Sequence, residues 1–505
     1  MNQRKIGALL SYLSQFISIL VGLLYTPIMI QLLGKSEYGL YELVNSTVSY
    51  LGLLSLGFGG AYTRYYSRCK VKKDETGIAR LNGMFLVIFL IIAAICILCG
   101  VIMIGNIEVI FGVGLEVEEY EKAKILMWML VFSMAVTFFG SVFDAQIMVQ
   151  ERFLFQKGLM ILQGLCSPFI TLPLLLFGYG SIAMVGVSTV LCLVKTGISI
   201  WYCMKKLNVQ FEFRGFQPSL LKEMWVFTFF IFLNQIIDQV NWNVDKFLIG
   251  RNLGTEFVAV YGVGAKLNML YLSLSNSVSG VFTPRINLLV SEKNKQKEIN
   301  QLFQKVGRIQ FLILSLVLTG FLLYGKEFIC LWVGDGYQEA YTVALLLIIP
   351  VTVPLIQNLG IEVQRAMNKH KARSMVYTAI ALVNVGISIV LIPRFGIVGA
   401  AFGTSVSLIV GNGIFMNIYY QKCINLDIRL FWKEILKLSV PLVPSILFGV
   451  LITRFITINN WLTLGIALIL YVSIFGVLQW YLGMNAEEQE LLRTPVKRIL
   501  EKRRK

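Results

Sequence analysis

Polar side chains repeat at helical spacing within the apolar stretch 222–248. Their positions are i, i+4, i+7 and i+11, so the side chains share one face of a helix. A polar stripe is unfavourable against lipid, so we expect it to face the interior. There it lines either a wet cavity that binds a substrate or a structural seam between helices. The stripe consists of Asn234, Asp238, Asn241 and Asp245, and it is broadened by Gln235 and Asn243.

Three lysines lie inside apolar stretches, where a charge is costly and usually faces a cavity or a partner. Such cations attract an anionic ligand. The lysines that are candidates to bind it are Lys195, Lys246 and Lys266. Arg64 and Arg365 are further candidates. They stand near the ends of their stretches, where membrane topology alone also accounts for them.

Four carboxylates inside or beside the apolar stretches are candidates to couple transport to Na⁺ or H⁺. They are Asp238, Asp245, Asp144 and Glu362. Glu362 stands three residues before Arg365 and can simply pair with it, and Asp144 can form a salt bridge or a cap. The chain has no nucleotide-binding loop, no Ser–His pairing and no His/Cys/carboxylate cluster of metal-ligand spacing. We therefore expect no enzyme activity, no cofactor and no ATP-driven step.

The elements that position these residues are membrane spans. Of 505 residues, 56% are hydrophobic and 14% are charged, with a mean hydropathy of +0.72, and only helices or closed barrels satisfy their backbone in lipid. Runs of about 20 apolar residues predict helices that cross the bilayer. The sequence thus predicts an all-α integral membrane protein with about fourteen spans: 6–33, 38–63, 81–105, 124–148, 155–177, 181–203, 222–248, 256–284, 303–324, 341–364, 374–393, 397–420, 434–456 and 459–482.

The basic residues predict the orientation of these spans. Most of the 45 Lys and Arg residues fall near the termini and in alternate loops, which belong to the cytoplasm. Both termini are then cytoplasmic, and the acidic loop 116–122 is external. The net charge of +17 reflects this topology, so no nucleic-acid partner is expected. The basic tail 485–505 is expected to rest on anionic lipid headgroups.

A short hairpin sequence occurs twice, about 220 residues apart. "LGKSEYGLY" at 33–41 is similar to "LGTEFVAVY" at 253–261, and three further pairs of segments match at nearly the same offset. We expect Gly34 and Gly254 to end a helix in the left-handed region, and Ser36 and Thr255 to cap the next helix. The duplication predicts a six-helix lobe at 1–215, a second at 216–428, two extra spans at 429–484 and a cytoplasmic tail. Within span 38–63 the segment "LGFGG" at 56–60 is expected to allow a bend.

The chain resembles the polysaccharide transporters, or oligosaccharide flippases, of the superfamily that includes multidrug extrusion pumps and the lipid II flippase. The resemblance rests on residues 9–67, the "LGxxEYGLY" hairpin, the segment "GDGYQEA" and the Gly-rich hairpin "RFGIVGAAFG". It implies two six-helix lobes around a cationic cavity. It also implies translocation of an undecaprenyl-diphosphate-linked oligosaccharide from the inner to the outer leaflet of the bacterial cytoplasmic membrane, for capsule, O-antigen or another surface polysaccharide.

Three other functions stay open from the sequence: a cationic-drug antiporter coupled to an ion, a lipid II flippase, and a non-transporting scaffold for polysaccharide assembly. The first span has no acidic residue and no arginine beyond its cytoplasmic edge, which favours the polysaccharide branch. Membrane lipids are expected partners. The resemblance further implies a polysaccharide polymerase and glycosyltransferases as partners. No site residue is carried over from the family.

Overall fold

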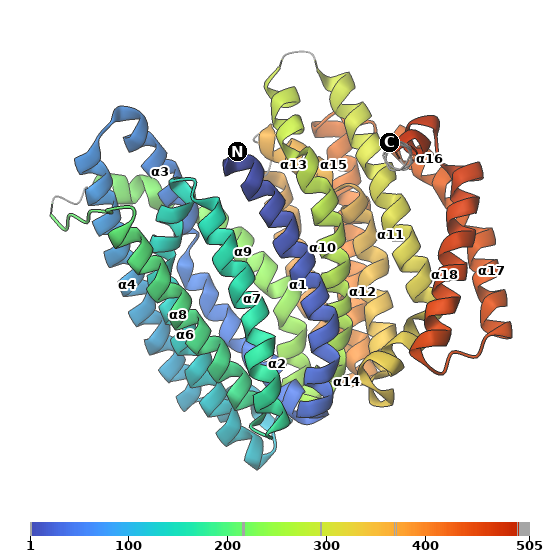
Figure 1. The fold of residues 1–505 in the computed structure, drawn as a ribbon, viewed down its shortest axis with the longest axis horizontal. Helices are drawn as coiled ribbons and strands as arrows, with labels where there is room; N and C mark the ends of the chain where they lie inside the picture. The colour runs from blue at the N-terminus through green and yellow to red at the C-terminus, as the bar shows by residue number, and fades with distance from the viewer. Residues whose placement is uncertain are drawn as a thin grey trace, which may run out of the picture. The chain divides into compact units, whose positions relative to one another are not determined.

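The computed structural model describes residues 3–214, 218–292, 295–367, 369, 371–491 and 493. In these residues all regular secondary structure is helical (Figure 1). The prediction of an all-α membrane protein is therefore confirmed. The basic tail from residue 494 onward lies outside the described residues, as does His370.

The chain divides into two compact units, each described here by itself. Unit 1 comprises residues 1–262 and 384–400, and unit 2 comprises residues 263–383 and 401–505. The helices that belong to unit 1 are α1 (Gln3–Leu33), α2 (Lys35–Ser49), η1 (Tyr50–Ser55), α3 (Phe58–Lys72), α4 (Glu75–Gly105), α5 (Ile107–Phe111), η2 (Gly112–Gly114), α6 (Val117–Val149), α7 (Phe153–Leu176), α8 (Gly180–Lys205) and α9 (Pro218–Leu253).

Two long helices contribute to both units, α10 (Thr255–Ser291) and α14 (Lys371–Leu408). The bounds of the units differ from those of the predicted lobes, which stay a prediction, because α9, the first helix of the second predicted repeat, packs with the first half of the chain. The helices within unit 2 are α11 (Gln296–Val333), η3 (Asp335–Tyr337), α12 (Glu339–Ile356), α13 (Asn358–Ala366), η4 (Ile409–Phe415), α15 (Met416–Cys423), α16 (Ile428–Ser439), α17 (Leu442–Phe455), α18 (Trp461–Leu478) and η5 (Gln479–Gly483).

Eleven stretches are long and apolar enough to cross a membrane among the described residues. Three features account for the difference from fourteen. The stretch Arg373–Cys423 joins two predicted spans, although Gly396 interrupts the helix at φ 60°. The predicted span 38–63 is broken into α2, η1 and α3, and α9, which covers the predicted span 222–248, is not one of the eleven stretches.

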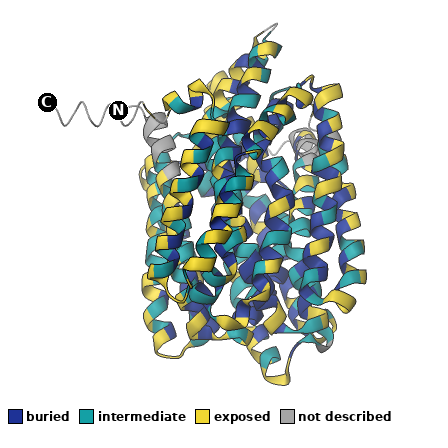
Figure 2. Cartoon of the chain, turned by 90° about the vertical axis from the view of Figure 1, so that its right-hand side faces the viewer, coloured by how far each residue is buried: buried dark blue, intermediate teal, exposed yellow. Residues whose placement is uncertain are grey.

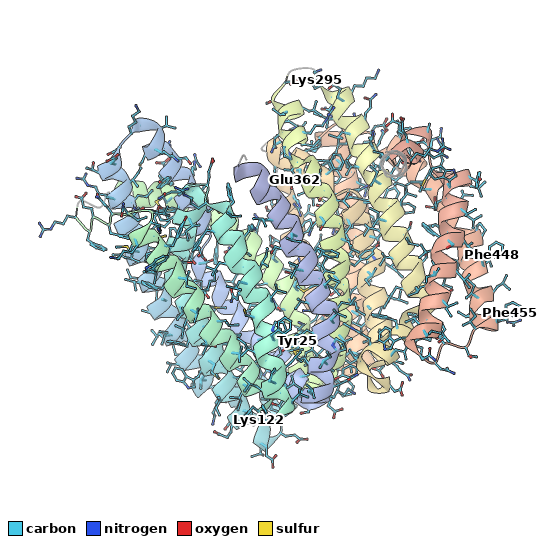
Figure 3. All side chains as sticks on the ribbon, in the orientation of Figure 1. Tyr25, Lys122, Lys295, Glu362, Phe448 and Phe455 are labelled. Carbon is cyan, nitrogen blue, oxygen red and sulfur yellow. The ribbon has the colours of Figure 1, made fainter. Side chains whose placement is uncertain are left out.

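Many large apolar side chains are exposed among the described residues, as contact with lipid allows, and Figure 2 shows exposed residues along the helices. In unit 2, Phe448 and Phe455 of α17 are exposed, and Figure 3 shows both side chains pointing away from the protein. Buried side chains lie between neighbouring helices. One cluster in unit 2 contains Tyr324, Tyr471 and Phe475.

The break in the second predicted span has a local cause. Leu56 and Gly57 both have positive φ, 49° and 72°, so the chain leaves η1 and restarts as α3. A Cβ on Gly57 would lie 2.6 Å from the Cγ2 of Ile231 in α9. Glycine therefore allows both the bend and the close approach of α9, which confirms the predicted bend at 56–60.

One hydrogen-bond arrangement occurs in both halves of the chain. In unit 1, Asn82 near the start of α4 donates to the Gln210 carbonyl at 2.9 Å, in the segment that follows α8. In unit 2, Asn300 near the start of α11 donates to the Asn425 carbonyl at 3.3 Å, in the segment that follows α15. Equivalent asparagines thus tie the third span of each predicted repeat to the loop after the sixth. This supports the duplication, whose exact boundaries stay a prediction.

Candidate functional site

A polar seam runs between α9 and the broken second span in unit 1. Gln239 donates from its amide to the Ser49 carbonyl at 3.0 Å and bonds the Ser49 hydroxyl at 3.3 Å. Asn243 donates to Gln239 one turn away, and the Ser55 hydroxyl donates to Gln235 at 3.4 Å. Amide side chains are therefore stacked along one face of α9, opposite the carbonyls and hydroxyls of α2 and η1.

This seam is not the predicted stripe. The side chains that face α2 and η1 are Gln235, Gln239, Asn243 and Lys246, which stand at i, i+4, i+8 and i+11. This second helical periodicity was present in the sequence, although Gln239 was not among the predicted site residues. The residues of the predicted stripe do not share one environment. Asn234 and Asp238 are exposed, Asn241 is half-buried and Asp245 is buried.

Among the described residues of unit 1, Lys246 forms the most enclosed ion pair within a predicted span. Its Nζ lies 2.6 Å from Oε2 of Glu42 on α2, and both side chains are only 15% exposed. The Tyr38 hydroxyl donates to Glu42 at 3.3 Å. Glu42 is another residue that was not among the predicted site residues, yet it is the only acidic residue in the predicted span 38–63. Its carboxylate offsets the charge of a lysine predicted to bind an anion.

Asp245 is fixed by hydrogen bonds from two other elements of unit 1. The Tyr261 hydroxyl of α10 donates to Oδ2 at 2.8 Å, and the Ser388 hydroxyl of α14 donates to Oδ1 at 2.9 Å. The carboxylate is 2% exposed. These bonds satisfy a buried acid, as the low polarity of its surroundings requires.

A second ion pair joins α6 to α8 in unit 1. Lys195 Nζ lies 2.9 Å from Oδ2 of Asp144, and Ser199 donates to Oδ1 at 3.1 Å. The structure thus brings together one predicted cation and one predicted coupling acid, and favours the salt bridge that the sequence left as an alternative for Asp144.

The remaining predicted residues are not gathered into one cluster. Glu362 and Arg365 pair with each other at 2.8 Å, and Figure 3 shows Glu362 at the same end of unit 2 as Lys295. Arg64 is exposed on α3. Lys266 of α10 is half-buried, and no carboxylate in the described part of unit 2 forms an ion pair with it.

A buried arginine in unit 2 was not among the predicted site residues. Arg308 of α11 bonds both carboxylate oxygens of Glu488, at 2.6 and 2.8 Å, and Oε2 of Glu434 on α16 at 2.8 Å. The Arg308 and Glu488 side chains are 6% and 4% exposed. This bidentate pair ties the residues that follow η5 to α11 and α16. It borders a polar pocket of about 560 Å³.

No group of three or more His, Cys, Asp or Glu side chains suited to a metal ion occurs among the described residues. The fold and its charged pairs instead define a multi-span membrane protein with polar side chains joined inside its spans. The chain belongs to the polysaccharide biosynthesis protein family, whose model matches residues 5–290. The predicted resemblance is thereby confirmed.

Similar proteins agree with this assignment. The Shigella flexneri protein named "Putative O-antigen transporter" is 20% identical over 400 residues, covering 77% of this chain and 91% of the relative. A lipid II flippase structure in an inward closed conformation has a TM-score of 0.75 at 15% identity and covers 93% of this chain and 98% of its own. An inward-facing multidrug transporter structure has a TM-score of 0.64 at 13% identity, with coverage of 84% and 99%. At these identities the structures show the shared fold alone.

Proposed function

We propose that this protein is a flippase that moves an undecaprenyl-diphosphate-linked oligosaccharide from the inner to the outer leaflet of the bacterial cytoplasmic membrane by alternating access. The family and the O-antigen relative support a role in surface polysaccharide export. The proposed orientation places both chain termini in the cytoplasm. A polysaccharide polymerase and glycosyltransferases are the proposed partner enzymes.

The observation that carries the proposal is the difference between the three lysines within predicted spans. Lys195 and Lys246 are each paired with a carboxylate, whereas Lys266 has no such partner among the described residues of its unit. An uncompensated cation inside a membrane span is costly unless an anion reaches it. A diphosphate is such an anion, so we assign its contact to Lys266.

The polar seam suits the sugar part of the substrate. Amide groups both donate and accept hydrogen bonds, which matches sugar hydroxyls better than a single strong charge does. We assign sugar contacts to Asn243 of the seam and to Asn234 and Asn241 of the predicted stripe, while Arg64 and Arg365 stay proposed contacts near the cytoplasmic ends. Lys195 and Lys246 reach an anion only after exchange of their carboxylate partners.

An apolar pocket in unit 2 suits the lipid tail. It has a volume of about 380 Å³ and lies between α10, α11, α12 and α18. Its lining includes Leu270, Leu274, Val317, Leu468 and Tyr471. A polyprenyl chain that occupies such a pocket remains in apolar surroundings while its polar head crosses.

The experiment that tests the function compares a deletion strain with the parent. We would quantify lipid-linked oligosaccharide on each membrane face together with surface polysaccharide. Complete repeat units retained on the inner face, with loss of surface polymer, support the flippase. Accumulation of lipid II on the inner face identifies the lipid II flippase instead. Normal export by a protein in which Asp238, Asp245 and Lys266 are all neutralised identifies a scaffold.

A second candidate function is an antiporter for cationic drugs, and the carboxylates near α9 favour it. Glu42, Asp238 and Asp245 outnumber Lys246 there, and acids of this kind bind cations. Proton or Na⁺ coupling in either function is assigned to Asp238 and Asp245, because Asp144 and Glu362 are held in ion pairs. Normal lipid-linked sugars with increased drug sensitivity in the deletion strain favour the antiporter.

A further inference from the structure

The two copies of the repeated hairpin meet in unit 1, through a carboxylate that belongs to neither. The Ser36 hydroxyl, in the first hairpin, donates to Oε1 of Glu119 at 2.6 Å. The Thr255 hydroxyl, in the second hairpin, donates to the same oxygen at 2.8 Å. Neither hydroxyl is the helix cap predicted from the sequence, because α2 and α10 begin at Lys35 and Thr255 and place both residues in their first turns.

The backbones at this contact approach as closely as glycine permits. A Cβ on Gly39 would lie 1.8 Å from the Thr255 carbonyl oxygen, and a Cβ on Gly114 would lie 1.8 Å from the Gly250 carbonyl oxygen. Any larger residue at these two positions forces the backbones apart. The four positions therefore join α2 and η2, from the first half of the chain, to α9 and α10, from the second.

One ion pair adds to this junction. Lys35 Nζ lies 3.6 Å from Oε2 of Glu256, so the charges that follow Gly34 and Gly254 also meet across the two hairpins. Both side chains are partly solvent-exposed, and such a pair contributes little alone. Glu119 has a firmer position, because its other oxygen accepts from the Glu116 amide at 3.0 Å in a capping box at the start of α6.

Other contacts at the same end of unit 1 remain within the first half of the chain. Glu37 accepts hydrogen bonds from the Ser181 amide at 2.6 Å and the Ser181 hydroxyl at 2.8 Å, and pairs with Lys122 at 3.2 Å. Burial acts to raise the pKa of Glu37, but these bonds and the Lys122 charge outweigh it and lower the pKa. Figure 3 shows Lys122 at this end of unit 1.

From these contacts we propose that Ser36, Glu119 and Thr255 form a clasp that closes the external side of the transport path and opens to release substrate. The role of the clasp rests on the proposed function, whereas the contacts that form the clasp do not depend on that function. The clasp lies at the acidic loop, on the face that the charge distribution predicts to be external. Its polar bonds are few, and Leu43 of α2 packs against Gly250 of α9 beside the glycine contacts, so opening breaks these contacts together. Glu119 acts as a positioning residue that holds the two repeated hairpins together.

A reversible cross-link tests whether the clasp opens. We would replace the eight native cysteines, introduce Ser36→Cys and Thr255→Cys together, and reconstitute the protein in vesicles that contain undecaprenyl-diphosphate oligosaccharide. Oxidation is expected to abolish translocation, and a reductant is expected to restore it. Translocation by the cross-linked protein at the rate of the reduced protein would overturn the proposal.

A matched control separates the clasp from general rigidity. Glu37→Cys with Ser181→Cys links α2 to α8 within the first half of the chain, where no opening is proposed. Its oxidised and reduced forms are expected to translocate equally. Equal inhibition by both cross-links would mean that any link at this end stops the protein, and would contradict a clasp at Glu119.

A readout without transport keeps the clasp testable if the proposed function fails. Thr255→Cys would be labelled with a membrane-impermeant maleimide in proteins that carry either Glu119→Ala or Glu118→Ala. Glu118 is an exposed neighbour on the same turn. Labelling is expected to be about tenfold faster with Glu119→Ala, because the Ser36 hydrogen bond to a charged acceptor is lost as well as the Thr255 bond that the cysteine has already removed. Equal labelling rates would show that Glu119 does not hold the hairpins together, whatever the protein transports.

Discussion

At the scale of single residues, the charged side chains inside the spans differ in whether an ion pair or hydrogen bonds within the protein already satisfy them. Lys195 and Lys246 are stabilised by carboxylates at 2.9 and 2.6 Å, and Asp245 by two hydroxyls. A residue that is already satisfied contributes to binding only at the cost of breaking that interaction. Candidate contacts with substrate are therefore ranked by their native partners, and Lys266 ranks first.

Replacement of Lys266 tests this ranking. Lys266→Gln is expected to reduce translocation of the lipid-linked oligosaccharide by about tenfold or more, because a direct charge contact with the diphosphate is lost. Lys266→Arg keeps the charge and is expected to retain most of the activity. The measurement is the initial rate in reconstituted vesicles at matched protein levels. A Gln variant as active as the Arg variant would remove Lys266 from the site.

The Glu42–Lys246 pair predicts a non-additive effect on stability. Glu42→Gln alone leaves an unpaired ammonium in a largely buried position and is expected to destabilise the protein by about 3 kcal/mol at most. The double variant Glu42→Gln/Lys246→Met removes both charges and is expected to recover much of this loss. Melting temperatures in detergent measure the effect. Losses that simply add in the double variant would indicate that the two side chains do not interact.

At the scale of elements, the second predicted span is the clearest case of a helix changed by its neighbour. The interruption at Leu56 and Gly57 lies where α9 crosses, and Ile231 occupies the space that a side chain on Gly57 needs. Hydrophobicity alone described this stretch as one span. The left-handed residues separate η1 from α3, and α2 and η1 carry the hydroxyls and carbonyls of the polar seam.

Two neighbouring glycines provide a matched test of this bend. Gly57→Ala is expected to lower the melting temperature and the translocation rate, because a positive φ costs a non-glycine residue about 1–2 kcal/mol and its Cβ meets Ile231. Gly59→Ala places a Cβ where nothing lies within 4 Å, within helix α3, and is expected to be neutral or slightly stabilising. Equal melting temperatures for the two variants would show that the bend tolerates a side chain.

At the scale of the whole molecule, the distribution of Lys and Arg makes a prediction about orientation that the helices alone do not decide. A helix crosses the membrane equally well in either direction, whereas basic loops are retained in the cytoplasm. The proposed clasp depends on the same orientation, because a closure at the cytoplasmic side would regulate entry of substrate instead of release.

Single cysteines read this orientation directly. Glu118→Cys, in the acidic turn before α6, is expected to react with an impermeant maleimide in intact cells. Lys72→Cys, near the end of α3, is expected to react only after permeabilisation. Both positions are exposed, so accessibility within the fold is not limiting. The reverse pattern would invert the predicted topology and place the clasp at the cytoplasmic face.

The sequence by itself determined the fold class, the approximate spans, the bend at 56–60 and the family resemblance. Runs of apolar residues, glycine and local charge are properties of neighbouring residues, so one chain read in order reveals them. The pairing of Lys246 with Glu42 joins residues 204 positions apart, and Thr255 meets Glu119 across 136 positions. Helical periodicity shows which side chains share a face, but only packing decides which distant face they meet. Tertiary structure therefore decided which charges are already paired, and where the two repeated hairpins join.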